Sequence, residues 1–257
     1  MTMAEKEEKK TMTRRRFIRN SSLLAGGAAI GGGLLGTLIG VNLDEQEQTK
    51  TDQQTGHNQT GNGQANNRAL MYFTNREDFE VLSAATERIF PEDDLGPGAV
   101  GLGVPYFIDH QLAGNYGNNT REYMRGPFFP GAETQGYQSP LKRNQIFDEG
   151  IRKMKELSQK KYKKNFHDLT GEQQDEILTQ FEEGKVKMRG VTSSTFFSLL
   201  RSAVLEGAYA DPLYGGNANM AGWKMKDYPG HQASYLAQIE AKDFKKIEPQ
   251  SLHAFHK

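Results

Sequence analysis

The sequence contains no cysteine among its 257 residues. This absence excludes disulfides, cysteine nucleophiles, thiolate-ligated iron–sulfur clusters and haem attached through a C-x-x-C-H motif. The 32 basic and 32 acidic side chains give a formal net charge of zero, so no excess of positive charge indicates a nucleic-acid-binding surface. Any redox centre that works with this chain must therefore belong to a partner.

The sequence also lacks the short motifs of several enzyme classes. No G-x-G-x-x-G follows a strand-like segment, and there is no Walker loop and no H-E-x-x-H. Four glycines alternate between residues 96 and 103, but without a preceding strand they indicate a flexible connection rather than a dinucleotide site. We therefore expect no catalytic, cofactor-binding or metal-binding residue in this chain.

The first 43 residues have the layout of an export signal. Up to Arg19 there are seven basic residues against three acidic ones, and an uncharged stretch rich in glycine and alanine then runs from Ser21 to Leu43. Arg14, Arg15 and Phe17 resemble the twin-arginine motif, Ser/Thr-Arg-Arg-x-Phe-Leu-Lys. The segment predicts export of a folded protein through the twin-arginine translocase.

A retained membrane anchor is the alternative interpretation of this segment, because roughly 20 apolar residues suffice to span a bilayer. Both interpretations place the rest of the chain on the extracytoplasmic face of the cytoplasmic membrane. Residues 44–68 are almost entirely polar, with Ala65 as the only apolar side chain. Such a segment cannot bury enough surface to offset the entropy of ordering, so we expect a disordered linker.

Beyond Ala69 the apolar residues recur at helical spacing, and no period-two segment indicates a strand. The pattern predicts an all-α domain over residues 69–240, with about five main helices and long irregular loops, followed by a polar C-terminal tail over residues 241–257. The expected helices run from a Thr74–Glu77 capping box to Pro91, from Pro105 to Gly114, from Ser139-Pro140 through Leu157, from a Thr170–Gln173 capping box to Gly184, and from about Thr192 to Ala210.

The connection from Asp211 to His231, here called the aromatic loop, combines glycines, prolines and aromatic residues. Glycine permits positive φ, proline fixes φ, and tyrosine and tryptophan offer rigid amphipathic area, so the loop predicts a preformed partner-binding surface. The alternative is that Tyr214 and Trp223 fold back over the helices. The two interpretations can both hold in one loop. The predicted contact residues are Pro212, Tyr214, Gly215, Gly216, Asn217, Trp223, Tyr228, Pro229 and Gly230.

The order of several motifs resembles the gluconate 2-dehydrogenase subunit 3 family. Members carry a helix, then Pro-x-Tyr-Gly-Gly-Asn, then Gly-Trp, then an aromatic-Pro-Gly, which correspond here to residues 212–217, 222–223 and 228–230. The helix 84–91 with Gly98-Ala99, and the segment 104–109, match the opening helices of the family. The resemblance covers roughly residues 13–43 and 75–240. Residues 217–221 depart from it, because they are small and polar where an arginine or acidic residue often occurs.

What the resemblance implies is a non-catalytic small subunit of an exported dehydrogenase complex. Its expected partners are a large subunit that binds FAD, the cytochrome c subunit that often accompanies it in the family, the twin-arginine translocase and the membrane. The small subunit would stabilise the flavoprotein and carry it through the translocase on its own signal. The alternative is a stand-alone extracytoplasmic enzyme or a tethered binding protein that acts through the aromatic loop.

Three groups of polar residues have alternative interpretations. In one interpretation Asp109 orients the neighbouring His110 as a general base. In the other, His110 lies at the C-terminal end of a helix and interacts with the helix dipole. Glu206 and Asp211 form a carboxylate pair, or one of them binds loop amides or an arginine. The lysine run between residues 160 and 164 predicts a solvated face.

Overall fold

The computed structural model describes residues 68–129, 131–132, 135–136, 138–236, 238–243 and 245–255, so the predicted signal segment and all but the last residue of the predicted linker lie outside it. Within these residues the regular structure is helical, and no strand longer than an isolated bridge occurs. The all-α prediction is confirmed. The α-helices are α2 (Arg76–Ile89), α3 (Val104–Ala113), α4 (Arg143–Tyr162), α5 (Gly171–Glu182), α6 (Ser193–Tyr209) and α7 (Ala221–Lys224), and the short 3₁₀ helices are η2 (Phe166–Asp168), η3 (Pro212–Tyr214), η4 (Ala218–Met220) and η5 (Leu252–Phe255).

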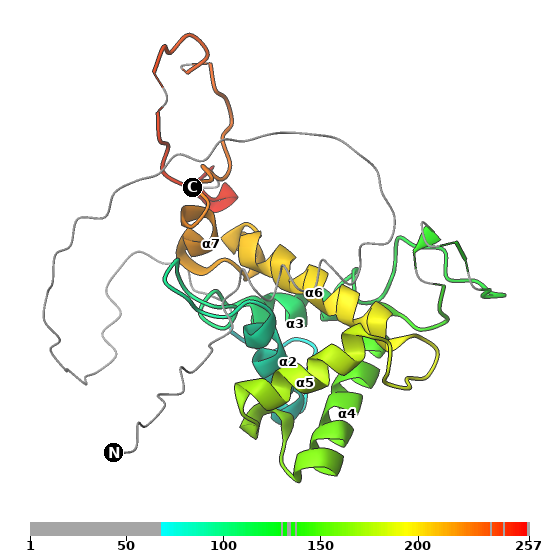
Figure 1. Ribbon diagram of the computed structural model, residues 1–257. Helices are drawn as coiled ribbons and strands as arrows, with labels where there is room; N and C mark the ends of the chain where they lie inside the picture. The colour runs from blue at the N-terminus through cyan, green and yellow to red at the C-terminus, as the bar shows by residue number, and fades with distance from the viewer. Residues whose placement is uncertain are drawn as a thin grey trace, which may run out of the picture.

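Helix α6 is the centre of the domain, since it contacts α2, α3, α4, α5 and α7 (Figure 1). The ring of Phe196 on α6 lies edge-on to Phe147 of α4 and Phe181 of α5, with ring centroids 5.7 and 5.5 Å apart. Gly150 of α4 makes this approach possible, because a Cβ atom there would lie 2.3 Å from the Phe196 ring. Within the described part of the chain, none of these helices combines the length and apolarity needed to cross a membrane.

The helix boundaries follow the predicted signals with two exceptions. The Thr170–Gln173 capping box, the Pro105 start and the Thr192 start are confirmed. The cap of α2 is Asn75 rather than Thr74, because the Asn75 side chain accepts the amide hydrogen of Glu77. The third helix begins at Arg143 rather than at the predicted Ser139-Pro140.

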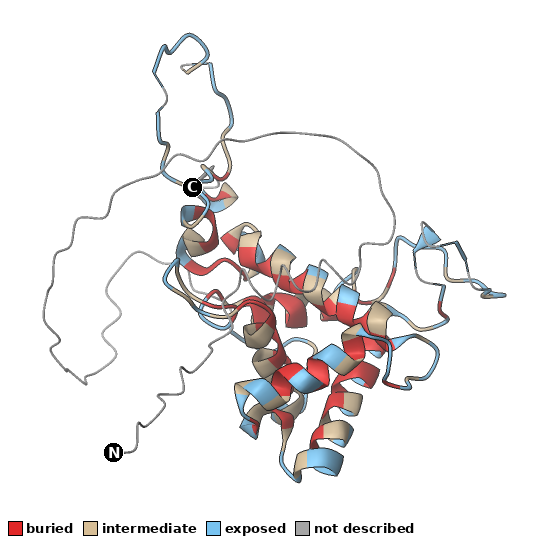
Figure 2. Ribbon diagram, in the orientation of Figure 1, coloured by how far each residue is buried: buried red, intermediate tan, exposed pale blue. Residues whose placement is uncertain are grey.

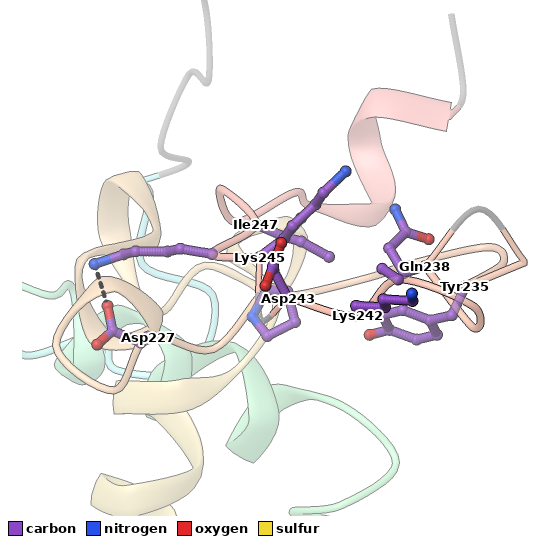
Figure 3. Close-up of a pocket in the computed structure, with 10 residues that line it drawn as sticks. Asp227, Tyr235, Gln238, Lys242, Asp243, Lys245 and Ile247 are labelled. Carbon is purple, nitrogen blue, oxygen red and sulfur yellow. Dashed lines mark ion pairs between the residues drawn. The ribbon is translucent and has the colours of Figure 1, made fainter.

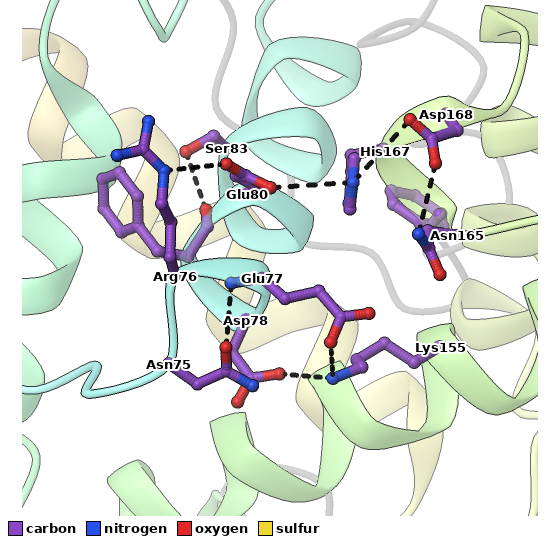
Figure 4. A network of polar contacts seen from close by, with 12 residues as sticks. Asn75, Arg76, Glu77, Asp78, Glu80, Ser83, Lys155, Asn165, His167 and Asp168 are labelled. Atoms are coloured by element: carbon purple, nitrogen blue, oxygen red, sulfur yellow. Dashed lines mark hydrogen bonds and ion pairs between the residues drawn. The ribbon is translucent and has the colours of Figure 1, made fainter.

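Charged side chains tie α2 to its neighbours on two sides. Lys155 of α4 lies 2.8 Å from both Glu77 and Asp78 in the first turn of α2 (Figure 4). At the other end of α2, Arg88 donates two hydrogen bonds, of 2.8 and 2.7 Å, to the carboxylate of Asp175 on α5. A bidentate arginine–carboxylate pair fixes orientation as well as distance. Helix α2 is thereby held in place against α4 and α5.

Candidate functional site

The aromatic loop begins at Asp211, directly after α6, and this residue joins two parts of the chain. Its carboxylate accepts the Leu213 amide hydrogen at 2.9 Å, which starts η3. The same carboxylate accepts hydrogen bonds from the Ser251 hydroxyl at 2.6 Å and the Leu252 amide at 2.8 Å. Asp211 therefore binds loop donors, as one of the two interpretations expected, while Glu206 is exposed on α6.

Two glycines let the backbone of the aromatic loop lie directly on the last turns of α6. A Cβ atom on Gly216 would lie 2.2 Å from the carbonyl oxygen of Gly207, and one on Gly222 would lie 2.0 Å from that of Ala208. Real Cβ atoms essentially never come this close to backbone atoms. Neither glycine has positive φ, so close approach rather than backbone conformation explains both.

Asn217 holds the turn between these two glycines. It is fully buried and has left-handed backbone angles (φ 47°, ψ 46°), which asparagine tolerates better than most residues. Its side-chain amide donates to the carbonyl of Ala210 at 2.8 Å, and its side-chain oxygen accepts from the amide of Gly222 at 2.7 Å. The Gly-Gly-Asn sequence is thus explained by the positive φ of Gly215 (94°), the close approach of Gly216 to α6 and the two hydrogen bonds of the Asn217 side chain.

The aromatic residues of the loop divide into a buried and an exposed set. Trp223 is only 5% exposed, and its indole nitrogen donates to the carbonyl of Tyr209 at 2.8 Å. The ring of Tyr228 lies against it at 5.5 Å, and Gly230 leaves room beside the indole. Tyr214, by contrast, is 52% exposed. Trp223 therefore folds back over the helices, as one interpretation of the loop expected. Tyr214 instead lies at the surface, as the other expected.

The other predicted contact residues are distributed in the same way. Pro212, Gly216, Asn217 and Gly230 are buried, so they shape the loop rather than present side chains at its surface. Gly215 and Pro229 are partly buried, and Tyr228 is half exposed. Leu213 was not among the predicted residues, yet its side chain is 47% exposed next to Tyr214.

The glycine-rich segment 96–103 packs beside the aromatic loop. The carbonyl of Leu102 accepts the amide hydrogen of Ala218 at 3.0 Å, and Gly96 lies against the sulfur of Met225. Glu87 of α2 organises this segment, because its carboxylate accepts the amide hydrogens of Glu92 at 3.0 Å and Val100 at 2.8 Å. Sequence reasoning missed Glu87, although it lies inside the helix motif that ends at Pro91.

Asp109 has a structural role that the sequence did not predict. It is fully buried on α3, and its carboxylate accepts the amide hydrogens of Met71, Tyr72 and Phe73 at 2.6, 3.1 and 2.9 Å. His110 makes a separate contact, 3.0 Å from its Nε2 to the carbonyl oxygen of Ala69. The interpretation of these neighbours as an oriented general base is therefore wrong, since Asp109 is used by backbone amides.

Large exposed apolar side chains occur only on loops and η3 in the described part of the chain, and none lies on the helices α2 to α7. Figure 2 shows the buried residues along the inward faces of these helices. Single exposed apolar side chains are common on protein surfaces, so they indicate an interaction surface only where several of them lie close together on a loop whose backbone is held in place. These residues are Leu70, Met71, Leu95, Val100, Tyr123, Phe129, Leu213, Tyr214, Tyr228, Tyr235, Leu236 and Ile239.

His167 and the lysine run make polar contacts near the surface of the domain. His167 lies 3.6 Å from Glu80 and 3.7 Å from Asp168 (Figure 4), and the predicted solvated face is confirmed, because every lysine of the run between 160 and 164 is exposed. Among the described residues, no group of three histidine, aspartate or glutamate side chains is arranged to hold a metal ion.

With this geometry established, the comparison with known families decides the identity of the domain. The family model of gluconate 2-dehydrogenase subunit 3 matches residues 76–230, which is more than half of the chain. The chain belongs to the gluconate 2-dehydrogenase subunit 3 family. The match begins with α2 and ends at Gly230, so it contains Glu87, Asp109 and the whole set of predicted loop contacts.

Membership in the subunit 3 family implies that the chain associates with a larger dehydrogenase complex. No curated protein and no solved structure gives a significant match. Within the family match, the residues that the sequence resemblance rests on are mainly those that fix the shape of the aromatic loop. The large apolar side chains that this shape exposes are Leu213, Tyr214 and Tyr228.

Proposed function

We propose that this chain is the non-catalytic small subunit of an exported FAD-dependent dehydrogenase complex. The observation that carries the proposal is the family match over residues 76–230, because the family is defined as a subunit of gluconate 2-dehydrogenase. FAD is expected in the large partner subunit, which would oxidise a sugar or sugar acid. A sequence without cysteine supplies no thiolate ligand for an iron–sulfur cluster, so this division of labour fits the chain.

The aromatic loop is the part of the domain best suited to contact the large subunit. The backbone of the loop is held by close contacts to α6. The side chains of Leu213 and Tyr214, near the start of the loop, are half exposed. A rigid loop loses little conformational entropy on binding, which favours affinity. Tyrosine at such a position is a frequent source of binding energy in protein interfaces.

Export of the complex is the second part of the proposal. Arg14, Arg15 and Phe17 form a twin-arginine motif ahead of an apolar stretch, and the translocase that reads such motifs carries folded proteins. The small subunit would therefore take the folded flavoprotein with it to the extracytoplasmic face of the cytoplasmic membrane. A cytochrome c subunit would then pass electrons from the flavin to the membrane.

Co-purification tests the proposal directly. The full chain carries a C-terminal tag in its native host and is extracted under mild conditions. We expect a larger polypeptide with flavin absorbance to elute with it at equal stoichiometry. Elution of the chain alone, without a flavoprotein, would contradict the proposal.

The alternative of a stand-alone enzyme predicts turnover by the purified chain itself. Its sequence basis was Asp109, His110 and Glu206, and Asp109 is buried under three backbone amides. Activity of the isolated chain on sugar acids, polyols or dyes that is lost in His110→Ala and Glu206→Gln would favour this alternative.

A further inference from the structure

The described residues between 232 and 249, which leave out 237 and 244, form an arm that projects from the end of the domain that carries α7 (Figure 1). The arm leaves and rejoins the domain at one point. There the amide of His231 donates to the carbonyl of Gln250 at 2.8 Å, and the amide of Gln250 donates to the carbonyl of Pro229 at 3.1 Å. These two hydrogen bonds close the base of the arm.

The base of the arm is built into the aromatic loop. Gly230 packs so tightly that a Cβ atom there would lie 2.5 Å from the indole of Trp223 and 2.4 Å from the carbonyl oxygen of Gln250. Asp211 binds Ser251 and Leu252, the residues that follow the arm. The exit and return of the arm are therefore held by the same residues that hold the aromatic loop.

Among its described residues the arm exposes three large apolar side chains, here called the apolar triad: Tyr235, Leu236 and Ile239. Their exposed fractions are 48%, 77% and 71%. Leu236 and Ile239 are among the most exposed apolar residues of the described chain, and exposing them to water costs free energy that burial against a partner would recover. The family match ends at Gly230, so the arm lies beyond it.

The two limbs of the arm enclose a hollow of about 560 Å³ that is lined by Tyr235, Ile247 and the stems of lysines (Figure 3). Lys246 closes one side through an ion pair with Asp227 at 2.5 Å. The hollow is large enough to accept a side chain or a short segment from another protein. Six of its ten lining residues are charged or carry an amide, but apolar atoms form most of its surface, and such a mixture also occurs in protein interfaces.

The net charge of the arm distinguishes between a lipid surface and a protein as its binding partner. Lys242, Lys245 and Lys246 are balanced by Glu240, Asp243 and Glu248, so the arm has no net charge. Attraction to anionic lipid headgroups grows with an excess of lysine and arginine, which the arm does not have. Apolar side chains with balanced charges match a protein surface better.

We propose that the arm is a second docking element for the large dehydrogenase subunit, which buries the apolar triad and inserts a segment into the hollow. This inference rests on the proposed function. The arm is continuous with the exposed Tyr228 of the aromatic loop, so one partner surface can contact both. Because the base is fixed, little ordering of the arm is required on binding.

The test compares two variants of the tagged full chain in its native host. In the first, the triad becomes polar (Tyr235→Ser, Leu236→Ser, Ile239→Ser). The matched control carries Tyr123→Ser and Phe129→Ser, which remove exposed aromatic surface from the loop after α3, near the opposite end of α6 (Figure 1). Helix content by circular dichroism verifies that both variants fold. The readout is the amount of flavoprotein eluted per small subunit, measured by its flavin absorbance.

We expect the triad variant to recover at least about tenfold less flavoprotein than wild type, while the control recovers a normal amount. Normal recovery by the triad variant overturns the role of the arm and leaves the proposed function intact. Equal loss in the control also overturns it, because the effect would not be specific to the arm. Normal flavoprotein recovery together with loss of sedimentation with membranes would assign the arm to lipid instead. If wild type recovers no flavoprotein, the proposed function fails and the role of the arm fails with it.

Discussion

The backbone amide of Phe73 donates a 2.9 Å hydrogen bond to the carboxylate of Asp109, 36 residues further along the chain. The amides of Met71 and Tyr72 bind the same carboxylate, so this one side chain fixes the segment that leads from the predicted linker into α2. The point at which the predicted linker joins the folded domain is thus set by a buried acid on α3.

Replacing Asp109 by alanine removes the acceptor of three amide hydrogens at once. Buried or half-buried amides without a partner are costly, so we expect Asp109→Ala to lower the free energy of unfolding by about 3 kcal/mol. Urea denaturation measures this loss, and limited proteolysis near residues 69–73 should become faster. The exposed Asp94→Ala serves as the control. Equal stability of both variants would contradict the role of Asp109.

Gly216 has no space for a side chain. A methyl group there would meet the carbonyl oxygen of Gly207 at 2.2 Å, and relieving that contact requires the loop to lift from α6. We expect Gly216→Ala to cost about 3 kcal/mol of stability. Gly114→Ala is the matched control, because its nearest contact would be 3.4 Å at ordinary φ. Thermal melts of the two variants that coincide would argue against the close approach.

Tyr214 and Trp223 should respond to substitution in opposite ways. Tyr214→Ala removes a half-exposed ring, so we expect unchanged thermal stability and about tenfold weaker recovery of the flavoprotein. Trp223→Ala leaves a cavity and removes the hydrogen bond from the indole to the carbonyl of Tyr209. We expect this variant to lose about 3–5 kcal/mol of unfolding free energy. Chemical denaturation and co-purification separate the two effects. A Tyr214→Ala chain that binds its partner normally would remove this residue from the proposed interface.

Glu149 should make stability depend on pH. Its burial acts to raise the pKa of the carboxyl group, but hydrogen bonds from Arg152 and from the Arg189 amide outweigh burial and hold the pKa below its ordinary value. The stabilisation is therefore present above the ordinary glutamate pKa, about 4.3, and is lost as the pH falls through the lower pKa of the folded state. We expect wild type to exceed Glu149→Gln in unfolding free energy at neutral pH, with the gap closing in acid. A difference in unfolding free energy that does not change with pH would contradict this role of Glu149. So would the same pH-dependent difference in the control, the exposed Glu92→Gln.

The twin-arginine pair is tested by exchange for lysine, which keeps the charge. We expect Arg14→Lys with Arg15→Lys to leave the chain and its flavoprotein in the cytoplasm, because the translocase receptor recognises the arginine pair. Cell fractionation with immunoblotting gives the distribution. The control, Arg16→Lys with Arg19→Lys, should be exported normally. Export of the first variant would show that another pathway operates.

Helices were predictable from the sequence because their signals are local. The apolar spacing, the Thr170 capping box and the terminating Gly114 lie within one or two turns of the helices they define. The start of the third helix was placed too early, since Ser139 instead donates through its hydroxyl to the carbonyl of Gly190, a contact between residues far apart in sequence.

The candidate site was only partly predictable, because it too depends on contacts between residues that are far apart in sequence. The aromatic loop was identified by its composition, but the division between buried Trp223 and exposed Tyr214 depends on where α6 ends relative to the loop. The roles of Glu87 and Asp109 depend on amides that lie 5 to 38 residues away, and apart from the nearby amide of Glu92 no local pattern reveals them.

The main-chain contact between Gly216 and Gly207 has a consequence for divergence among relatives. Because the outline of the aromatic loop is set by backbone packing rather than by the outward side chains, Leu213, at the variable position of the Pro-x-Tyr-Gly-Gly-Asn motif, can change without altering that outline. A relative can therefore present a different surface to its partner by exchanging a projecting side chain, as long as Gly216, Gly222 and Asn217 keep the backbone of the loop in place.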